Sequence, residues 1–439
     1  MMTTRIASWH LHERRLPQQL ALLRRGRTFN GLMFGMLAAG FALLMHGELQ
    51  WLAFLTHAAT AALFYLAGAG WAGRAWPEQR QAAGADPSPS HGALQKQLRA
   101  LATASHDLRQ PMHAMALYID KVNRDGGIRG QKIELVTMDD KFEPKLTAEN
   151  ARVLIEDKGA VALFLTRGTP NTEAVLPWLD KYGVPLVGPS TGAMVLHAPL
   201  QKHVFNVRST YQREAEKAVQ HLATIGVRRI AVVHADDSFG RDCLEGANKG
   251  FLTAELEPLA IIKADRQKPD YGPIVRRIAD SQAQAVLWFG SGNAVADGIV
   301  KLRGTGSAAQ VITLSNNASS GFIKSLGTHS RGVIVTQVFP SERSTANGMV
   351  AEATQLIRAH GKSELSPAML EGYAAAKVLV EGLRRAAGPR ITRDRLVAAL
   401  ESIDRVDLGG LEMGYTRTSH TGLNFVDLSI IGHDGRFRR

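Results

Sequence analysis

The feature that most constrains the fold is a regular alternation of short apolar runs with amphipathic helical patterns, which begins near residue 118. The apolar, β-branched runs occupy residues 132–140, 160–166, 184–190, 228–237, 283–290, 309–315 and 331–340. Helical patterns separate several of them, as at 144–157, 213–226 and 271–281. Strands that alternate with helices of this length predict βαβ units, so we expect an α/β fold with parallel sheets.

The loops after these strands are small and polar, and ligands of open parallel sheets bind at such strand ends. The stretches "RGTPNT", "PSTGAM", "DDSFG", "GSGN" (with Ser291) and "SNNASSG" offer hydroxyls, amides and backbone N–H groups. These groups suit a neutral or zwitterionic small molecule. The loops contain no convincing Ser-His-Asp, paired-carboxylate or metal-ligand arrangement, so we expect no cofactor, no metal and no catalytic site there.

Charge and cysteine content exclude several other classes of protein. The formal net charge is +12, but its densest cluster, at residues 14–27, lies beside an apolar run. Charge in that position sets membrane orientation more often than it binds nucleic acid, and we expect no nucleic-acid partner. Cys243 is the single cysteine, so neither an intrachain disulfide nor a Cys-based zinc site can form.

Two charge-free apolar runs, 29–45 and 51–71, predict a transmembrane helical hairpin over residues 29–73. A basic segment, 1–28, precedes the hairpin, and a linker rich in Pro, Ser, Gly and Ala follows at 74–93. The alternative is a helical hairpin buried in a soluble protein. Basic residues flank both spans on the outer sides, which predicts an inner-membrane, two-pass protein whose C-terminal region is cytoplasmic.

A heptad pattern follows the linker and predicts a helix that packs against another helix, through which the chain would dimerise over residues 94–119. The pattern comprises Leu94, Leu98, Leu101, Ser105, Leu108, Met112, Met115 and Ile119. His106 lies beside this seam, and Asp107 is placed to orient its imidazole.

The stretch "SHDLRQPMHAM" resembles the H-box of sensor histidine kinases. The resemblance implies a phosphoacceptor fragment over residues 94–117, with His106 as the phosphoacceptor and Asp107 as its acid/base partner. It also implies a kinase or a response regulator as a partner. The sequence departs from that family after Ile119, because no ATP-binding motifs follow. We therefore expect His106 to be phosphorylated only in trans.

The remaining residues, 118–439, resemble type I periplasmic binding proteins of the leucine/isoleucine/valine-binding class, the substrate-binding subunits of ABC importers. The stretches that carry the resemblance include "YIDKVNRDGGIRGQKIELVTMDD", "VPLVGPSTGA", "DDSFGRDCLEG" and "FVDLSIIGHDGRF". The resemblance implies two Rossmann-like lobes that close on a ligand, a permease partner and a periplasmic location. Lobe 1 would hold 118–207 and 346–404, and lobe 2 would hold 208–335 and 415–439.

By motif position, the resemblance assigns ligand-binding residues to both lobes. Thr169, Asn171 and Thr172 match the loop that binds a ligand carboxylate, and Ser190 and Thr191 match the loop that holds carboxylate and ammonium. Lobe 2 would add the residues Phe239, Asn316 and Asn317. An asparagine near the position of an acidic ammonium partner leaves an amide, a urea-like compound or an aromatic acid as open as an α-amino acid.

The two resemblances meet near residues 115–119, and the first strand and glycine-rich loop of the binding fold are missing there. Lobe 1 would then close on itself, borrow another segment or be only marginally stable. The join indicates a fusion of two truncated proteins: a natural sensor, an inactive remnant or an assembly artefact. We expect a membrane-tethered receptor for an amino-acid-type or amide-type solute; the alternative is a signalling protein that uses His106 in a phosphorelay.

Overall fold

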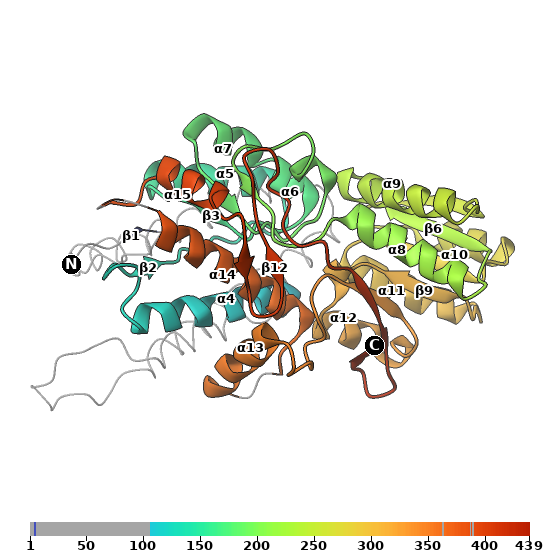
Figure 1. Ribbon diagram of the computed structural model, residues 1–439. Coiled ribbons are helices and arrows are strands. Elements are labelled where there is room, and N and C mark those ends of the chain that lie inside the picture. The colour runs from blue at the N-terminus through green and yellow to red at the C-terminus, as the bar shows by residue number, and fades with distance from the viewer. Residues whose placement is uncertain (1–3, 6–105, 362–363, 387, 389) are drawn as a thin grey trace, which may run out of the picture. The chain divides into compact units, whose positions relative to one another are not determined.

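The structure is a computed structural model, and it describes residues 4–5, 106–361, 364–386, 388 and 390–439. At residues 4–5 and 106–110 it describes the backbone alone. All of these residues belong to one structural unit of the chain, within which two lobes can be distinguished (Figure 1).

Lobe 2 is built on a continuous seven-stranded sheet with the strand order β14-β13-β10-β9-β8-β6-β7. Five strands are parallel, and β13 and β14 are added antiparallel at one edge. The strands are β6 (Ile230–Ala235), β7 (Ala260–Ala264), β8 (Ala285–Phe289), β9 (Gln310–Thr313), β10 (Ile334–Gln337), β13 (Asp427–Ile431) and β14 (Phe437–Arg438). The prediction of an α/β fold with a parallel sheet is thus confirmed.

Helices cover both faces of this sheet (Figure 1). They are α8 (Tyr211–Thr224) and α9 (Ser238–Thr253) on one face, and α10 (Tyr271–Asp280), α11 (Gly292–Gly304) and α12 (Ser320–Leu326) on the other. Because both faces are covered, every residue of β6 and β8 is buried, which explains their unbroken apolar runs. Side chains cap the helix starts: Thr210 accepts from the Arg213 amide, and Asp237 accepts from the Gly240 amide.

Lobe 1 has an interrupted sheet. Three short parallel strands, β3 (Leu163–Phe164), β4 (Leu186–Val187) and β5 (Val204–Phe205), form one sheet. β2 (Ile133–Glu134) belongs to a separate pair, in which its parallel partner is β1 (Thr4–Arg5) from the start of the chain. No ladder joins β2 to β3 among the described residues. Among the described residues, no strand lies between β2 and β3, in agreement with the predicted loss of the first strand, and β2 is paired with a segment from the start of the chain.

Helices supply most of the framework of lobe 1. They are α4 (His106–Arg124), α5 (Pro144–Arg152), α6 (Thr169–Glu173), α7 (Leu176–Tyr182), α13 (Gly348–Ala359), α14 (Pro367–Arg385) and α15 (Arg393–Glu401). A small hairpin of β11 (Val406–Asp407) and β12 (Glu412–Met413) follows them. A π-helical turn, η1 (Val153–Asp157), extends α5, and 3-10 turns occur at η2 (Met194–Leu196), η3 (Ser315–Asn317) and η4 (Gly327–His329).

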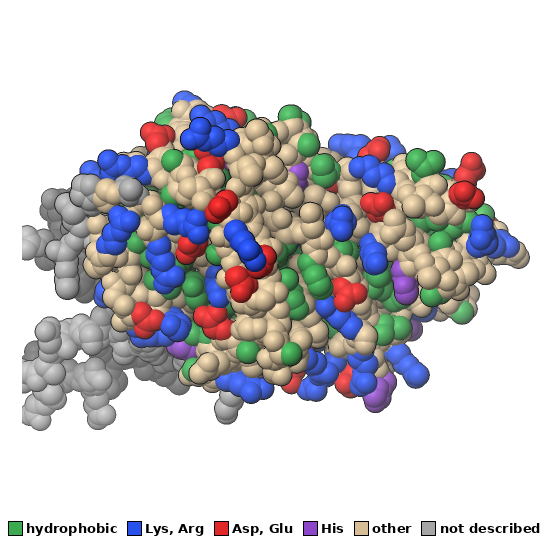
Figure 2. All heavy atoms as spheres, viewed as in Figure 1, with side chains coloured by type: hydrophobic (Ala, Val, Ile, Leu, Met, Phe, Trp, Pro, Cys, Tyr) green, Lys and Arg blue, Asp and Glu red, His purple; other side chains and the backbone are tan. Residues whose placement is uncertain are grey.

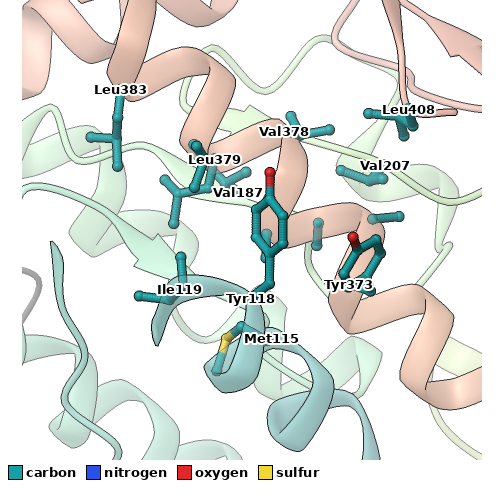
Figure 3. Close-up of a cluster of buried hydrophobic side chains, with 14 of the residues drawn as sticks. Met115, Tyr118, Ile119, Val187, Val207, Tyr373, Val378, Leu379, Leu383 and Leu408 are labelled. Carbon is teal, nitrogen blue, oxygen red and sulfur yellow. The ribbon is translucent and has the colours of Figure 1, made fainter. Parts of the chain in front are cut away.

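Helix α4 runs unbroken through the predicted join and packs along α14 (Figure 1). The ring centroids of Tyr118 and Tyr373 are 5.1 Å apart in an edge-to-face arrangement (Figure 3). The helix backbones approach so closely that a Cβ at Gly372 would lie 2.0 Å from the carbonyl oxygen of Pro111. Met115 and Ile119 are buried in this core (5% and 1% exposed), so they are not free to face a second copy of the helix as the predicted dimer requires.

Three segments connect the lobes, near residues 207–210, 338–347 and 414–426. The first and third lie side by side and are hydrogen-bonded to each other. The Asn206 amide donates to the carbonyl of His420 at 3.0 Å, and the Leu423 amide donates to that of Val207 at 2.9 Å. The Tyr415 hydroxyl adds a bond to the Asn206 carbonyl oxygen at 2.7 Å.

A buried charge cluster lies where the first segment enters lobe 2. Arg208 pairs with Glu214 of α8, and both side chains are almost fully buried. Arg208 also donates to the Ser315 hydroxyl at 2.8 Å, and Glu371 of α14 lies 3.7 Å from its guanidinium. Glu214 in turn accepts from the Ser315 amide and the Thr336 hydroxyl. The cluster therefore links helices of both lobes.

The predicted transmembrane hairpin at 29–73 and the linker at 74–93 lie outside the described residues, as does the basic segment 1–28 apart from β1. Within the described part of the chain, no helix has the length and apolarity needed to cross a bilayer. His106 and Asp107 begin α4, but their side chains are outside the described residues.

Candidate functional site

The polar loops of lobe 1 meet at the ends of β3 and β4. The Ser190 amide donates to the Thr166 carbonyl at 2.7 Å, which holds the two loops together. The hydroxyls of Thr169 and Thr191 lie 2.8 Å apart, and those of Thr166 and Thr172 lie 3.0 Å apart. Four of the predicted residues, Thr169, Thr172, Ser190 and Thr191, are thus brought together as expected for neighbouring parallel strand ends, although all four are buried.

Asn171, the fifth predicted residue of lobe 1, has partners in its own lobe and in lobe 2. Its amide nitrogen donates to the Thr147 hydroxyl at 2.8 Å and approaches Asp140 at 3.3 Å. Its amide oxygen accepts from Arg266 of lobe 2 at 3.1 Å. All of the hydrogen-bonding atoms of this side chain are therefore engaged within the protein, in contacts that position the loop and connect the lobes.

Gly168 precedes α6 in this loop and has a positive φ of 86°. A Cβ at this position would lie 2.7 Å from the ring of Phe142, so a glycine lets the loop pass close to that ring. The guanidinium of Arg266 stacks on the same ring at 4.5 Å. The loop at Gly168 is thus fixed by its close contact with the Phe142 ring as well as by hydrogen bonds.

Lobe 2 contributes residues from three strand ends. Phe239 begins α9 after β6, and its ring meets that of Tyr211 edge-to-face at 4.9 Å. Ser291 is half-buried and occupies the N-cap position of α11 after β8, although its side chain makes no capping bond. Asn316 and Asn317 both reach the carbonyl of Gly290, at 3.0 and 3.3 Å. The two asparagines therefore tie the ends of β8 and β9 together.

Three side chains that the sequence analysis did not single out cross from one lobe to the other. Arg167 donates to the carbonyl oxygen of Asn316 at 3.1 Å. Ser238 donates to Glu173 at 2.6 Å. Arg266 reaches Asn171 while it pairs with Asp237 of its own lobe at 3.0 Å. For Arg167 and Ser238 the signal in the sequence was position, since both directly follow predicted strands.

Two titratable groups with shifted pKa values lie close to where the lobes meet. Burial raises the pKa of Asp242 to about 6, although bonds from Gln212 at 2.8 Å and from the Met194 amide at 3.2 Å favour its ionised form. Burial, assisted by the positive charge of Arg208, lowers the pKa of His197 to about 4. Burial also raises the pKa of the Cys243 thiol well above its usual value, so this cysteine is a core residue and not a nucleophile.

The chemistry of this site is that of hydrogen bonding. Among the described residues, no group of three or more His, Cys, Asp or Glu side chains is placed to hold a metal ion. On the face in Figure 2, basic and acidic side chains are interspersed over the surface. A shallow hollow lies elsewhere, at the edge formed by β13 and β14, and is lined by Arg331, Ile430 and His433 among others. We assign the site to the strand ends because it is there that hydrogen-bonding groups of both lobes converge.

Comparison with known proteins agrees with this architecture. A family model described as "Periplasmic binding protein" matches residues 104–428, which include the helix that also carries the H-box-like stretch. A Leu/Ile/Val-binding protein homolog 3 from Brucella melitensis is 26% identical over 276 residues, which cover 61% of this chain and 72% of the relative.

Solved structures show the same fold. A substrate-binding periplasmic protein from Ralstonia solanacearum is 30% identical, with a TM-score of 0.70, and the match covers 75% of this chain and 94% of that chain. A solute-binding protein of an ABC transporter from R. palustris, in complex with benzoate, has a TM-score of 0.67 at 16% identity over 76% of this chain and 91% of its own. The chain therefore belongs to the periplasmic binding protein family, and it is a solute-binding receptor of the class that includes the Leu/Ile/Val-binding proteins.

Proposed function

We propose that this protein binds a small solute of the amino-acid or amide type between its lobes and delivers it to an ABC permease. The observation that carries the proposal is the convergence of polar groups from both lobes at the strand ends. The hydroxyls of Thr169 and Thr191 and the backbone after β4 come from lobe 1, while Ser291 and Asn316 come from lobe 2. Two lobes that share hydrogen bonds across a site can be drawn together by a ligand that adds further bonds.

The names of similar proteins support a small organic ligand. The Brucella relative is named for leucine, isoleucine and valine, and the R. palustris structure contains benzoate. Each of these compounds combines a carboxylate with an apolar body. We infer that the solute of this receptor has a similar size and also carries at least one group that bonds to the strand-end loops.

We propose further that residues 29–73 tether the receptor to the inner membrane. The support is the pair of charge-free apolar runs in the sequence. The flanking basic residues favour a cytoplasmic receptor domain, whereas the family precedent favours the periplasm. A phosphorelay role for His106 rests on the sequence resemblance alone, and we do not propose it.

The test is a thermal-shift titration of the full chain, extracted in detergent, against amino acids, their amides and aromatic acids. A ligand at 100 times its Kd should stabilise the protein by about 2.7 kcal/mol. Thr191→Val removes a hydroxyl from the site and should weaken this shift, whereas Thr418→Val, at an exposed position, should not. If no compound of the panel shifts the unfolding temperature, the proposed function is wrong.

A further inference from the structure

Arg167 brings a positive charge to the site, and the protein bonds only part of its hydrogen-bonding capacity among the described residues. It lies three residues after the end of β3 and forms a parallel bridge with Ser190, so its backbone is fixed between the two lobe 1 loops. Arg167 is half-buried as a residue, and its guanidinium donates one bond, to the carbonyl oxygen of Asn316. A guanidinium has five N–H donors, so several remain for a ligand.

The acidic side chains around the site have partners within the protein, although the hydroxyl partner of Glu173 leaves its charge in place. Glu173 accepts from the Ser238 hydroxyl, and Asp237 pairs with Arg266. Glu214 pairs with Arg208 in the buried cluster. Within the described part of the chain, none of the ion pairs includes Arg167. Arg167 is therefore a cation of the site that has no ion-pair partner among these residues.

The opposite side of the site offers a neutral acceptor. The amide nitrogen of Asn316 donates to Gly290 and to the Asn317 side chain, which fixes its orientation. Its amide oxygen is buried and has no hydrogen-bond partner among the described residues. Such an oxygen can accept from a hydroxyl or an amide, but it cannot neutralise an ammonium. Burying a charge without an opposite charge is costly, so this environment disfavours an ammonium.

We propose that Arg167 is the anion-binding residue of the site and that the preferred ligand is a carboxylate without an ammonium group. The inference rests on the proposed receptor function, and it names a carboxylate as the ligand in place of the amino-acid or amide type. Arginine pairs with a carboxylate through two parallel hydrogen bonds, and the bond is stronger because both groups are charged. Because Arg167 already contacts Asn316 of lobe 2, a ligand held by its guanidinium would lie where the two lobes meet.

The test compares ligands that differ only in charge. One series is 4-methylpentanoate, leucine and 3-methylbutylamine, and the other is 3-phenylpropanoate, phenylalanine and 2-phenylethylamine. Calorimetric titration of the full chain in detergent should rank the carboxylate first in at least one series. The amino acid should bind at least about tenfold more weakly, which corresponds to an unpaired ammonium. The amine should not bind.

Variants of Arg167 test its role directly. Arg167→Gln should weaken binding of the carboxylate by about 10- to 100-fold, whereas Arg167→Lys should retain part of the affinity. Arg277→Gln is the matched control, because Arg277 is exposed on α10. The unfolding temperature of each variant without ligand shows whether folding is intact.

The outcomes separate this inference from the proposed function. If leucine or phenylalanine binds as tightly as the matching carboxylate, the receptor function stands and the ligand class is wrong. If Arg167→Gln folds and binds the carboxylate as tightly as the unmodified protein, Arg167 is not the anion-binding residue. If no compound of either series binds and the wider panel causes no thermal shift, the proposed function fails, and the inference fails with it.

Discussion

The two lobes have similar sequence patterns but hold together in different ways. Lobe 2 has a continuous seven-stranded sheet with buried central strands. Among the described residues, lobe 1 has a three-stranded sheet and two separate pairs, and its strands are two residues long. Most of the 19 residues of α14 are buried, and the largest part of the lobe 1 core gathers around this helix (Figure 3).

The difference shows that helix packing can stabilise a lobe built from βαβ units when its sheet is incomplete. In lobe 2, backbone ladders join every strand to its neighbour, and the helices cover them. In lobe 1, α4 and α14 contact each other along their length, and β3, β4 and β5 lie between that core and a smaller one on their other face. We therefore expect lobe 1 to depend more on helix packing and lobe 2 more on its sheet.

The largest effect is expected from breaking the charge cluster that joins the lobes. Arg208→Met leaves Glu214 buried without its partner, which should lower the free energy of unfolding by about 3–5 kcal/mol. Chemical denaturation followed by circular dichroism measures the loss. The exposed pair of Arg405 with Glu412 is the matched control, and Arg405→Met should cost less than about 1 kcal/mol. Equal losses for the two variants would show that the cluster does not link the lobes energetically.

The next effect concerns Asp242 of lobe 2, which accepts a bond from the Met194 amide of lobe 1. Its pKa in the folded protein is about 6, above the value of about 3.9 in an unfolded chain, so folding favours the protonated form. This contribution to stability is complete below about pH 4 and is lost as the pH rises through about 6. Asp242→Asn remains neutral and should be more stable than the unmodified protein at pH 7, by up to about 2–3 kcal/mol.

Urea denaturation of both proteins between pH 4 and pH 7 measures this difference, which should vanish near pH 4. The lowered pKa of His197 acts with the opposite sign, because its contribution is lost as the pH falls from about 6.5 through about 4. His197 is present in both proteins, so its effect cancels in the comparison. A stability difference that is independent of pH would contradict the assignment of the titration to Asp242.

The smallest expected loss of stability comes from a substitution in lobe 1, and it tests whether the two lobes unfold separately. Gly372→Ala places a methyl group against the backbone at Pro111 and should destabilise the packing of α4 on α14 by about 1–3 kcal/mol. Hydrogen exchange should then accelerate in lobe 1 peptides and remain unchanged in β6 and β8. Gly304→Ala is the control, because nothing lies within 4 Å of a Cβ at that position of α11. Equal acceleration in both lobes would mean that they unfold as one unit.

The alternation of strands and helices was sufficient to predict the α/β class and the parallel strands of lobe 2, because each buried strand is a continuous apolar run. It also placed Thr169 and Thr191 in neighbouring loops, since parallel strands end at one edge. It could not predict the contacts between lobes. Arg167 and Arg266 reach their partners over separations of 149 and 95 residues, and no local pattern encodes such distances.

The heptad pattern of α4 predicted the helix but not the element that it packs against. The spacing of Met112, Met115 and Ile119 correctly indicated a helix with one apolar stripe, but the same spacing fits a partner in the same chain as well as in a second copy. The partner is α14 of lobe 1. Periodicity identifies which face of a helix is covered, and the covering element has to be found by other means.

The hydrogen bonds between the first and third connecting segments have a mechanical consequence. Two chain segments that are hydrogen-bonded side by side bend together, but they resist being twisted against each other or pulled apart. Tyr415 and Leu423 fasten the third segment to Asn206 and Val207 of the first, so neither can swing alone. We therefore expect the two segments to bend together when the lobes open, so that the groups facing each other at the strand ends return to the same register when the lobes close.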